Sequence, residues 1–178
     1  MKARVYGLPR SGTNFLEYLI RNNTDLEYKN EFGISPYFGK YSAIKHCKPK
    51  DDDKDLYILI FKNKNNFTIS YNKWRKTPKD KILKMYDIAM NDYVEFYKNN
   101  KNKTVIIAYE QLIGNEIKLL NHLSTEYGVG LTKDIDIPKK RMDKSGGKGI
   151  TGAEFRIDER NLLVDKDSVL LPYIFKLD

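Results

Sequence analysis

The residues best suited to chemistry lie near the start of the chain, in the segment Gly7-Leu8-Pro9-Arg10-Ser11-Gly12-Thr13-Asn14. A short β-rich run precedes this segment. A helical pattern follows it, with apolar residues at Phe15, Leu16, Leu19 and Ile20. The first turn of a helix presents backbone N–H groups and the positive end of the helix dipole, which together attract anions. We therefore predict that residues 7–14 bind a phosphate group or a sulfate group.

The spacing of the two glycines alone is also compatible with an ordinary strand-to-helix turn. In a loop that binds nucleoside triphosphates, the second glycine is followed by lysine and then by serine or threonine. Here Gly12 is followed by Thr13 and Asn14, and the basic residue of the loop is Arg10. The missing lysine argues against hydrolysis of ATP or GTP.

The rest of the chain alternates between strand and helix patterns. We expect strands at 26–28, 41–46, 56–61 and 104–109, helices at 11–22, 67–74, 79–99 and 117–127, and a loop at 30–41. The continuous apolar run at 56–61 is typical of the centre of a parallel sheet covered on both faces. These patterns predict one α/β domain over residues 1–178, with three α/β/α layers around a mainly parallel sheet. We also expect a glycine-rich mobile loop at 145–152 and an apolar end that docks on the domain.

Composition limits the classes of function. The chain has 178 residues and a net charge of +8, which favours an anionic partner such as a nucleotide, a polyanion or a nucleic acid. One cysteine and two histidines exclude a Cys/His zinc site in practice, and no acidic pair suggests a metal. No signal peptide and no membrane-spanning run is evident, so we expect a soluble cytoplasmic protein.

The hexamer Leu8-Pro9-Arg10-Ser11-Gly12-Thr13 resembles the 5′-phosphosulfate loop of the sulfotransferase family. Members transfer a sulfuryl group from 3′-phosphoadenosine 5′-phosphosulfate (PAPS) to a hydroxyl or amine and release 3′-phosphoadenosine 5′-phosphate (PAP). The resemblance implies a fold similar to that of the P-loop nucleotide triphosphatases and a transfer that needs no metal. It implies that the donor is bound by Leu8, Pro9, Arg10, Ser11, Gly12, Thr13 and Asn14.

Later segments are similar to further motifs of the family, in the same order along the chain. Lys62 and Ser70 stand where the family binds the 3′-phosphate, with lysine in place of the usual arginine. Tyr109 begins a Tyr-Glu-Gln-Leu segment similar to the family's Tyr-Glu-Asp-Leu. Lys148 and Gly149 resemble the loop that closes over the 3′-phosphate, although Gly147 replaces its arginine. We therefore assign Lys62, Ser70, Tyr109, Lys148 and Gly149 to donor binding.

The transfer also needs a base to accept the proton of the acceptor. The segment Ile44-Lys45-His46-Cys47-Lys48-Pro49 resembles a family segment whose histidine is that base, although the register differs by one residue. A histidine can act near neutral pH without a large pKa shift. His46 is therefore our candidate base, with Glu31 as the alternative. Lys45 could hold the sulfuryl oxygens, and Arg10 the bridging oxygen of the donor.

Three other functions remain open from the sequence. A nucleotide-dependent kinase or phosphotransferase would need ATP and magnesium. A basic nucleic-acid-binding module is less favoured, but residues 71–84 are rich in lysine and tyrosine. A degenerate sulfotransferase would bind the nucleotide without turnover. The identity of the acceptor is not encoded in any recognisable motif.

Overall fold

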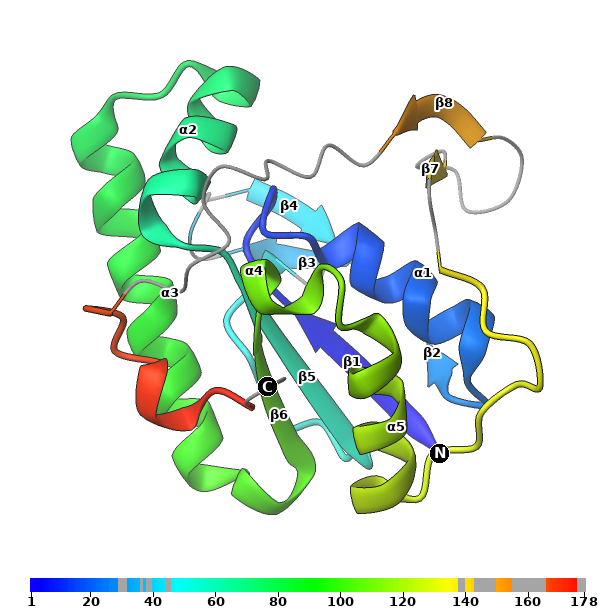
Figure 1. Ribbon diagram of the computed structural model, residues 1–178. Coiled ribbons are helices and arrows are strands. Elements are labelled where there is room, and N and C mark those ends of the chain that lie inside the picture. The colour runs from blue at the N-terminus through cyan, green and yellow to red at the C-terminus, as the bar shows by residue number, and fades with distance from the viewer. Residues whose placement is uncertain are drawn as a thin grey trace.

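The structure is a computed structural model that describes residues 1–28, 32–35, 37, 40–43, 46–137, 140–142, 150–154 and 166–175 (Figure 1). Its centre is a parallel sheet with the strand order β2-β1-β5-β6. These strands are β1 (Lys2–Tyr6), β2 (Glu27–Tyr28), β5 (Leu56–Phe61) and β6 (Thr104–Ala108). The β2 strand is only two residues long, so three strands supply most of the sheet.

The β5 strand is central because both of its faces are apolar. Leu56, Ile58 and Ile60 belong to one hydrophobic cluster, whereas Tyr57, Leu59 and Phe61 belong to another on the opposite face. Every residue of the strand is buried. The unbroken apolar run is thus explained by two covered faces, as the sequence predicts.

Helices cover both faces of the sheet. The first cluster is completed by α1 (Thr13–Asn23) and α5 (Glu116–Tyr127), and the second by α2 (Lys64–Arg75) and α3 (Lys79–Asn99). Figure 1 shows the two pairs on opposite sides of the strands. The predicted α/β architecture with helices on both faces of a parallel sheet is confirmed.

Several element boundaries differ from the sequence-based expectation. The α2 helix begins at Lys64, three residues before the predicted start, because the Asn63 side chain caps it. The side-chain Oδ1 of Asn63 accepts hydrogen bonds from the backbone N–H groups of Asn65 at 2.9 Å and Asn66 at 3.4 Å. Two short elements border β6, namely η2 (Lys101–Lys103) before it and α4 (Tyr109–Leu112) after it.

Two antiparallel hairpins stand apart from the main sheet. The first pairs β3 (Phe32–Ser35) with β4 (Lys40–Ala43), so the prediction of an irregular loop over residues 30–41 is wrong. The predicted strand at 41–46 is also too long, since β4 ends at Ala43 and His46 has a 3-10 helical conformation. The second hairpin pairs β7 (Lys140–Met142) with β8 (Ile150–Glu154). Part of the expected glycine-rich loop is therefore strand, and residues 143–149 lie outside the described residues.

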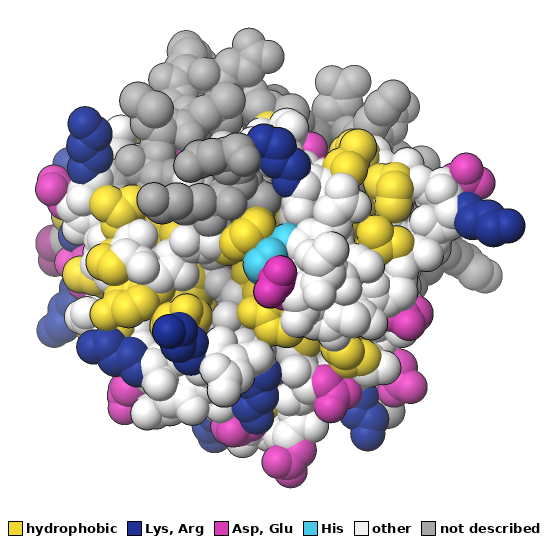
Figure 2. Space-filling view, turned by 60° about the horizontal axis from the view of Figure 1, so that its bottom comes forward, with side chains coloured by type: hydrophobic (Ala, Val, Ile, Leu, Met, Phe, Trp, Pro, Cys, Tyr) yellow, Lys and Arg dark blue, Asp and Glu magenta, His cyan; other side chains and the backbone are white. Residues whose placement is uncertain are grey.

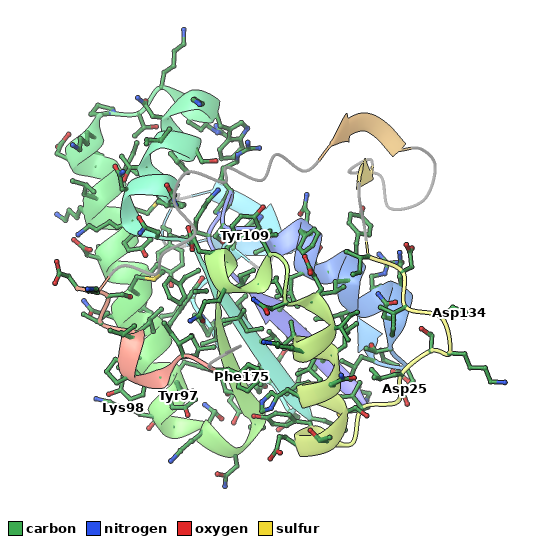
Figure 3. The ribbon with its side chains drawn as sticks, in the orientation of Figure 1. Asp25, Tyr97, Lys98, Tyr109, Asp134 and Phe175 are labelled. Atoms are coloured by element: carbon green, nitrogen blue, oxygen red, sulfur yellow. The ribbon has the colours of Figure 1, made fainter. Side chains whose placement is uncertain are left out.

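The segment 166–175 docks on the outer edge of β6. Its helical turn η4 (Leu171–Tyr173) follows the fully buried Leu170. The Phe175 N–H donates a hydrogen bond of 2.9 Å to the carbonyl oxygen of Ile106 in β6, and Figure 3 shows Phe175 beside this strand. The predicted docking of the apolar end is confirmed for the residues described.

The charged side chains are spread over the surface. On the face shown in Figure 2, basic and acidic side chains both occur around the rim, and hydrophobic side chains reach the surface between them. None of the helices described has both the length and the apolar character needed to cross a bilayer.

Candidate functional site

The loop of residues 7–14 joins the carboxyl end of β1 to the first turn of α1. The backbone N–H and the hydroxyl of Ser11 both donate to the carbonyl oxygen of Leu8, the former at 3.1 Å, which closes a tight turn. Arg10 in this turn has a φ of 75°, in the left-handed region that disfavours side chains. Helical hydrogen bonding starts with the Leu16 N–H donating to the Gly12 carbonyl oxygen at 3.0 Å.

Both glycines of the loop are required by close packing. A Cβ atom on Gly7 would lie 2.5 Å from Thr13 Cγ2 and 2.7 Å from the carbonyl oxygen of Ile60. A Cβ atom on Gly12 would lie 2.2 Å from Cδ2 of Tyr109, and Gly12 also has a φ of 91°. The glycine spacing therefore reflects contacts of the loop with the ends of β5 and β6.

The N-terminal end of α1 differs from those of the other long helices described. The α2 helix has its Asn63 cap, while α3 and α5 carry Asp80 and Glu116 in their first turns. By contrast, α1 has no side-chain cap on Gly12 and no acidic residue in its first turn. Because no carboxylate of the first turn offsets the positive end of the α1 dipole, the N-terminus of this helix can bind an anion.

A second cation lies next to the loop, at the carboxyl ends of β5 and β6. The Lys62 ammonium group is 4.8 Å from the centre of the Tyr109 ring, and the edge of the same ring packs against Gly12. Figure 3 shows Tyr109 where β6 meets α4. Burial, with the nearby charges of Glu110 and Glu116, raises the pKa of Tyr109 to about 12, so its hydroxyl remains a proton donor at neutral pH.

The carboxyl group of Glu110 holds the turn that carries Lys62. Glu110 is only 4% exposed, and its Oε1 accepts hydrogen bonds of 3.0 Å from the Asn63 N–H and from the Asn66 side-chain amide. Its Oε2 is buried and accepts no hydrogen bond from the residues described. Burial raises the pKa of Glu110, although the bonds from Asn66 and Asn63 and the charge of Lys62 oppose this.

Glu110 belongs to the Tyr-Glu-Gln-Leu segment that is similar to a family motif, but we predicted no role for it from the sequence. Its signal is a carboxylate immediately after a buried strand, at the edge where sites in parallel sheets form. The two asparagines that bind it are far away in the sequence, so this contact could not be inferred from spacing.

The side chain of His46 contacts Gly7, the first residue of the loop. Its Nδ1 is 2.6 Å from the carbonyl oxygen of Gly7. Since a carbonyl oxygen only accepts hydrogen bonds, Nδ1 carries the proton, and Nε2 is the basic nitrogen of the neutral ring. The structure thus places the His46 ring against Gly7, in the same loop that carries Arg10 and leads into α1.

Other predicted residues are less closely associated with the loop. Ser70 lies in the second turn of α2 rather than at its start. Four predicted site residues lie outside the described residues: Glu31, Lys45, Lys148 and Gly149. Within the described ranges, no group of three His, Cys, Asp or Glu side chains could hold a metal ion.

The two aromatic residues Tyr71 and Trp74 of α2 differ in burial. Tyr71 is buried against Phe67, but Trp74 is 41% exposed, with the Arg75 guanidinium 4.3 Å from its ring centre. His122 stacks on Phe175 with a centroid distance of 3.6 Å, which is a packing contact.

Comparisons with models of protein families, with curated proteins and with solved structures each gave no match.

Proposed function

We propose that this protein is a PAPS-dependent sulfotransferase with a fold similar to that of the P-loop nucleotide triphosphatases. The observation that carries the proposal is the contact of His46 with Gly7, at 2.6 Å, in a loop that also carries Arg10 and opens α1. In the proposal, His46 as the base, Arg10 as the cation and the N-terminus of α1 form one site. Such a set is what transfer of an anionic group to a hydroxyl requires.

In the proposed reaction, the acceptor oxygen attacks the sulfur of PAPS while the bond between sulfur and the bridging phosphate oxygen breaks. The bond electrons leave with that oxygen, which becomes part of PAP, and Nε2 of His46 takes the acceptor proton. Arg10 stabilises the charge that develops on the bridging oxygen. Backbone N–H groups at the start of α1 bind the 5′-phosphate.

Lys62 supplies the charge for the 3′-phosphate in this proposal. Its ammonium group lies over the Tyr109 ring, next to Gly12, and Glu110 holds the turn on which it stands. In the proposal the enzyme acts in the cytoplasm without a metal. Loops that bind nucleoside triphosphates have a lysine directly after the second glycine, and Gly12 is followed by Thr13. This difference favours PAPS over ATP as the donor.

Thermal unfolding with different ligands tests the proposal. PAP at a hundred times its dissociation constant should stabilise the protein by about 2.7 kcal/mol. ATP with magnesium and a single-stranded oligonucleotide at the same concentrations serve as controls. No shift with millimolar PAP, or an equal shift with ATP and magnesium, would contradict the proposal.

A further inference from the structure

A groove beside α3 is not used by the donor site. It consists of two adjoining cavities of about 360 Å³ and 410 Å³ that share Tyr37, Lys81 and Met85 in their walls. One cavity extends to Ile88 and Lys48, and the other to Tyr71 and Arg75.

The floor of the groove is apolar. Lys81, Met85, Ile88 and Asp92 follow one another at intervals of four, three and four residues, so they lie on one face of α3. Ile88 remains 48% exposed on this face. The groove can therefore bury an apolar group that replaces water on Met85 and Ile88.

The rim of the groove is basic, and its lysines differ in whether they form an ion pair with a described residue. Lys48 forms an ion pair of 2.8 Å with Asp92, which also accepts a hydrogen bond of 2.9 Å from the Tyr37 hydroxyl. Lys81 and Lys84 form no ion pair with any residue that the structure describes. The lining thus has an excess of positive charge next to an apolar floor, which complements an anion with an apolar body.

One residue of the groove lies close to the proposed base in the chain. Lys48 lines the groove and stands two residues after His46, so their Cα atoms lie within about 7 Å of each other. His46 itself lines neither cavity, so a ligand whose other end meets Lys81 and Lys84 must extend past Lys48 to reach the His46 ring.

We propose that this groove binds the sulfuryl acceptor, and that the acceptor is an amphiphilic anion with an apolar body between its hydroxyl and its charge. The assignment of the groove to the acceptor rests on the proposed function.

Two probes of equal chain length test the charge requirement: 8-hydroxyoctanoate, which is an anion, and octane-1,8-diol, which is neutral. Trp74 is the only tryptophan of the chain and contacts Tyr71 and Arg75 of the groove, so its fluorescence can report binding without a donor present. We expect the anion to bind at least about fivefold more tightly than the diol. Equal affinities would overturn the proposal.

The double variant Lys81→Gln, Lys84→Gln should remove this preference, because it removes two charges that have no ion pair among the described residues and keeps the side-chain stems. Lys73→Gln is the matched control, since Lys73 is an exposed residue on α2 that does not line the groove. Ile88→Asn should weaken both probes, because it makes the exposed floor polar. Unchanged binding in the double variant would contradict the assignment.

Transfer assays with PAPS separate this inference from the proposed function. Charge-dependent binding without sulfation of the probe or of other hydroxyl compounds would overturn the proposed function and leave the groove as an anion site. Sulfation of 8-hydroxyoctanoate that is unaffected in the double variant would support the enzyme and overturn the groove as its acceptor site.

Discussion

Arg10 combines a strained backbone with a side chain suited to catalysis. Its φ of 75° disfavours any residue with a Cβ atom, so Arg10→Gly should be more stable than Arg10→Ala by about 1 kcal/mol. Both variants should lose transfer activity by about 10²–10³-fold, because both lack the guanidinium group. Urea denaturation and a PAPS transfer assay measure the two effects.

Lys76 is the control for Arg10. It also has a positive φ, 46°, but it ends α2 away from the loop. Lys76→Gly should likewise be more stable than Lys76→Ala, and both variants should keep full activity. Activity retained in Arg10→Ala would refute the role of the guanidinium.

The roles of the two ring nitrogens of His46 can be tested separately. His46→Asn can still donate to the Gly7 carbonyl oxygen from its amide, whereas His46→Ala cannot. We expect His46→Asn to bind PAP with nearly unchanged affinity and to transfer about 10²–10⁴-fold more slowly, because it lacks the basic nitrogen. His46→Ala should weaken PAP binding as well. Full activity in either variant would assign the base to another residue.

At the scale of the elements, the packing of α1 on the end of β6 is set by Gly12. Gly12→Ala should destabilise the protein by about 1–2 kcal/mol from its positive φ, and by about 1–3 kcal/mol more from the clash with Tyr109. Gly114→Ala is the matched control, because Gly114 has a φ of 84° with nothing within 4 Å of the added Cβ. Equal losses in chemical denaturation would show that the Tyr109 contact is unimportant.

The free energy of unfolding should depend on pH through Glu110, which holds the turn between β5 and α2. Burial raises its pKa in the folded protein, so the folded state holds the proton more tightly than the unfolded state. Its contribution to stability is therefore present at low pH and is lost as pH rises through the folded pKa. Glu110→Gln should gain stability relative to the wild type over this range, measured by urea denaturation from pH 4 upward. A difference that does not change with pH would contradict this.

The sequence predicts some of these elements well and others poorly. The apolar run of β5 and the helical stripe of α3 are local patterns, and they identify both elements directly. The β3–β4 hairpin is missed because Gly33, Pro36 and Gly39 indicate a loop, whereas Gly33 pairs with Ser42 in the hairpin and positions 36 and 39 fall between the two strands in the sequence. Turn residues mark the connection and say little about the strands on either side of it.

The site was only partly predictable for a similar reason. The anion-binding character of residues 7–14 follows from the glycines and the helix that succeeds them. The contacts of Gly12 with Tyr109, of His46 with Gly7 and of Glu110 with Asn66 join distant segments. They depend on the order of the strands in the sheet, which no local pattern contains.

At the scale of the whole molecule, the docked segment 166–175 links β6 to α5 through His122. Burial under Phe175 lowers the pKa of His122 below its usual value of 6.5. Phe175→Ala should raise this pKa, as measured by NMR titration of the ring protons. Leu171→Ala is the control, because Leu171 is an exposed residue of the same segment.

The same shift has a consequence for stability. The unfolded state binds the His122 proton more readily, so the wild type should lose stability as pH falls below about 6.5. The loss should be smaller in Phe175→Ala. Equal pH dependence in the two proteins would indicate that Phe175 does not shield His122 in solution.

The long-range contacts of the loop also constrain when the loop can form during folding. The Ser11 hydroxyl lies 3.5 Å from the carbonyl oxygen of Ile60, 49 residues away, and Gly12 needs Tyr109 from still further along the chain. Closing such loops is slow compared with forming a local helix. Residues 7–14 therefore reach their final conformation late in folding, only when β1, β5 and β6 have assembled. An N-terminal fragment that lacks β6 should contain the loop sequence without the loop structure.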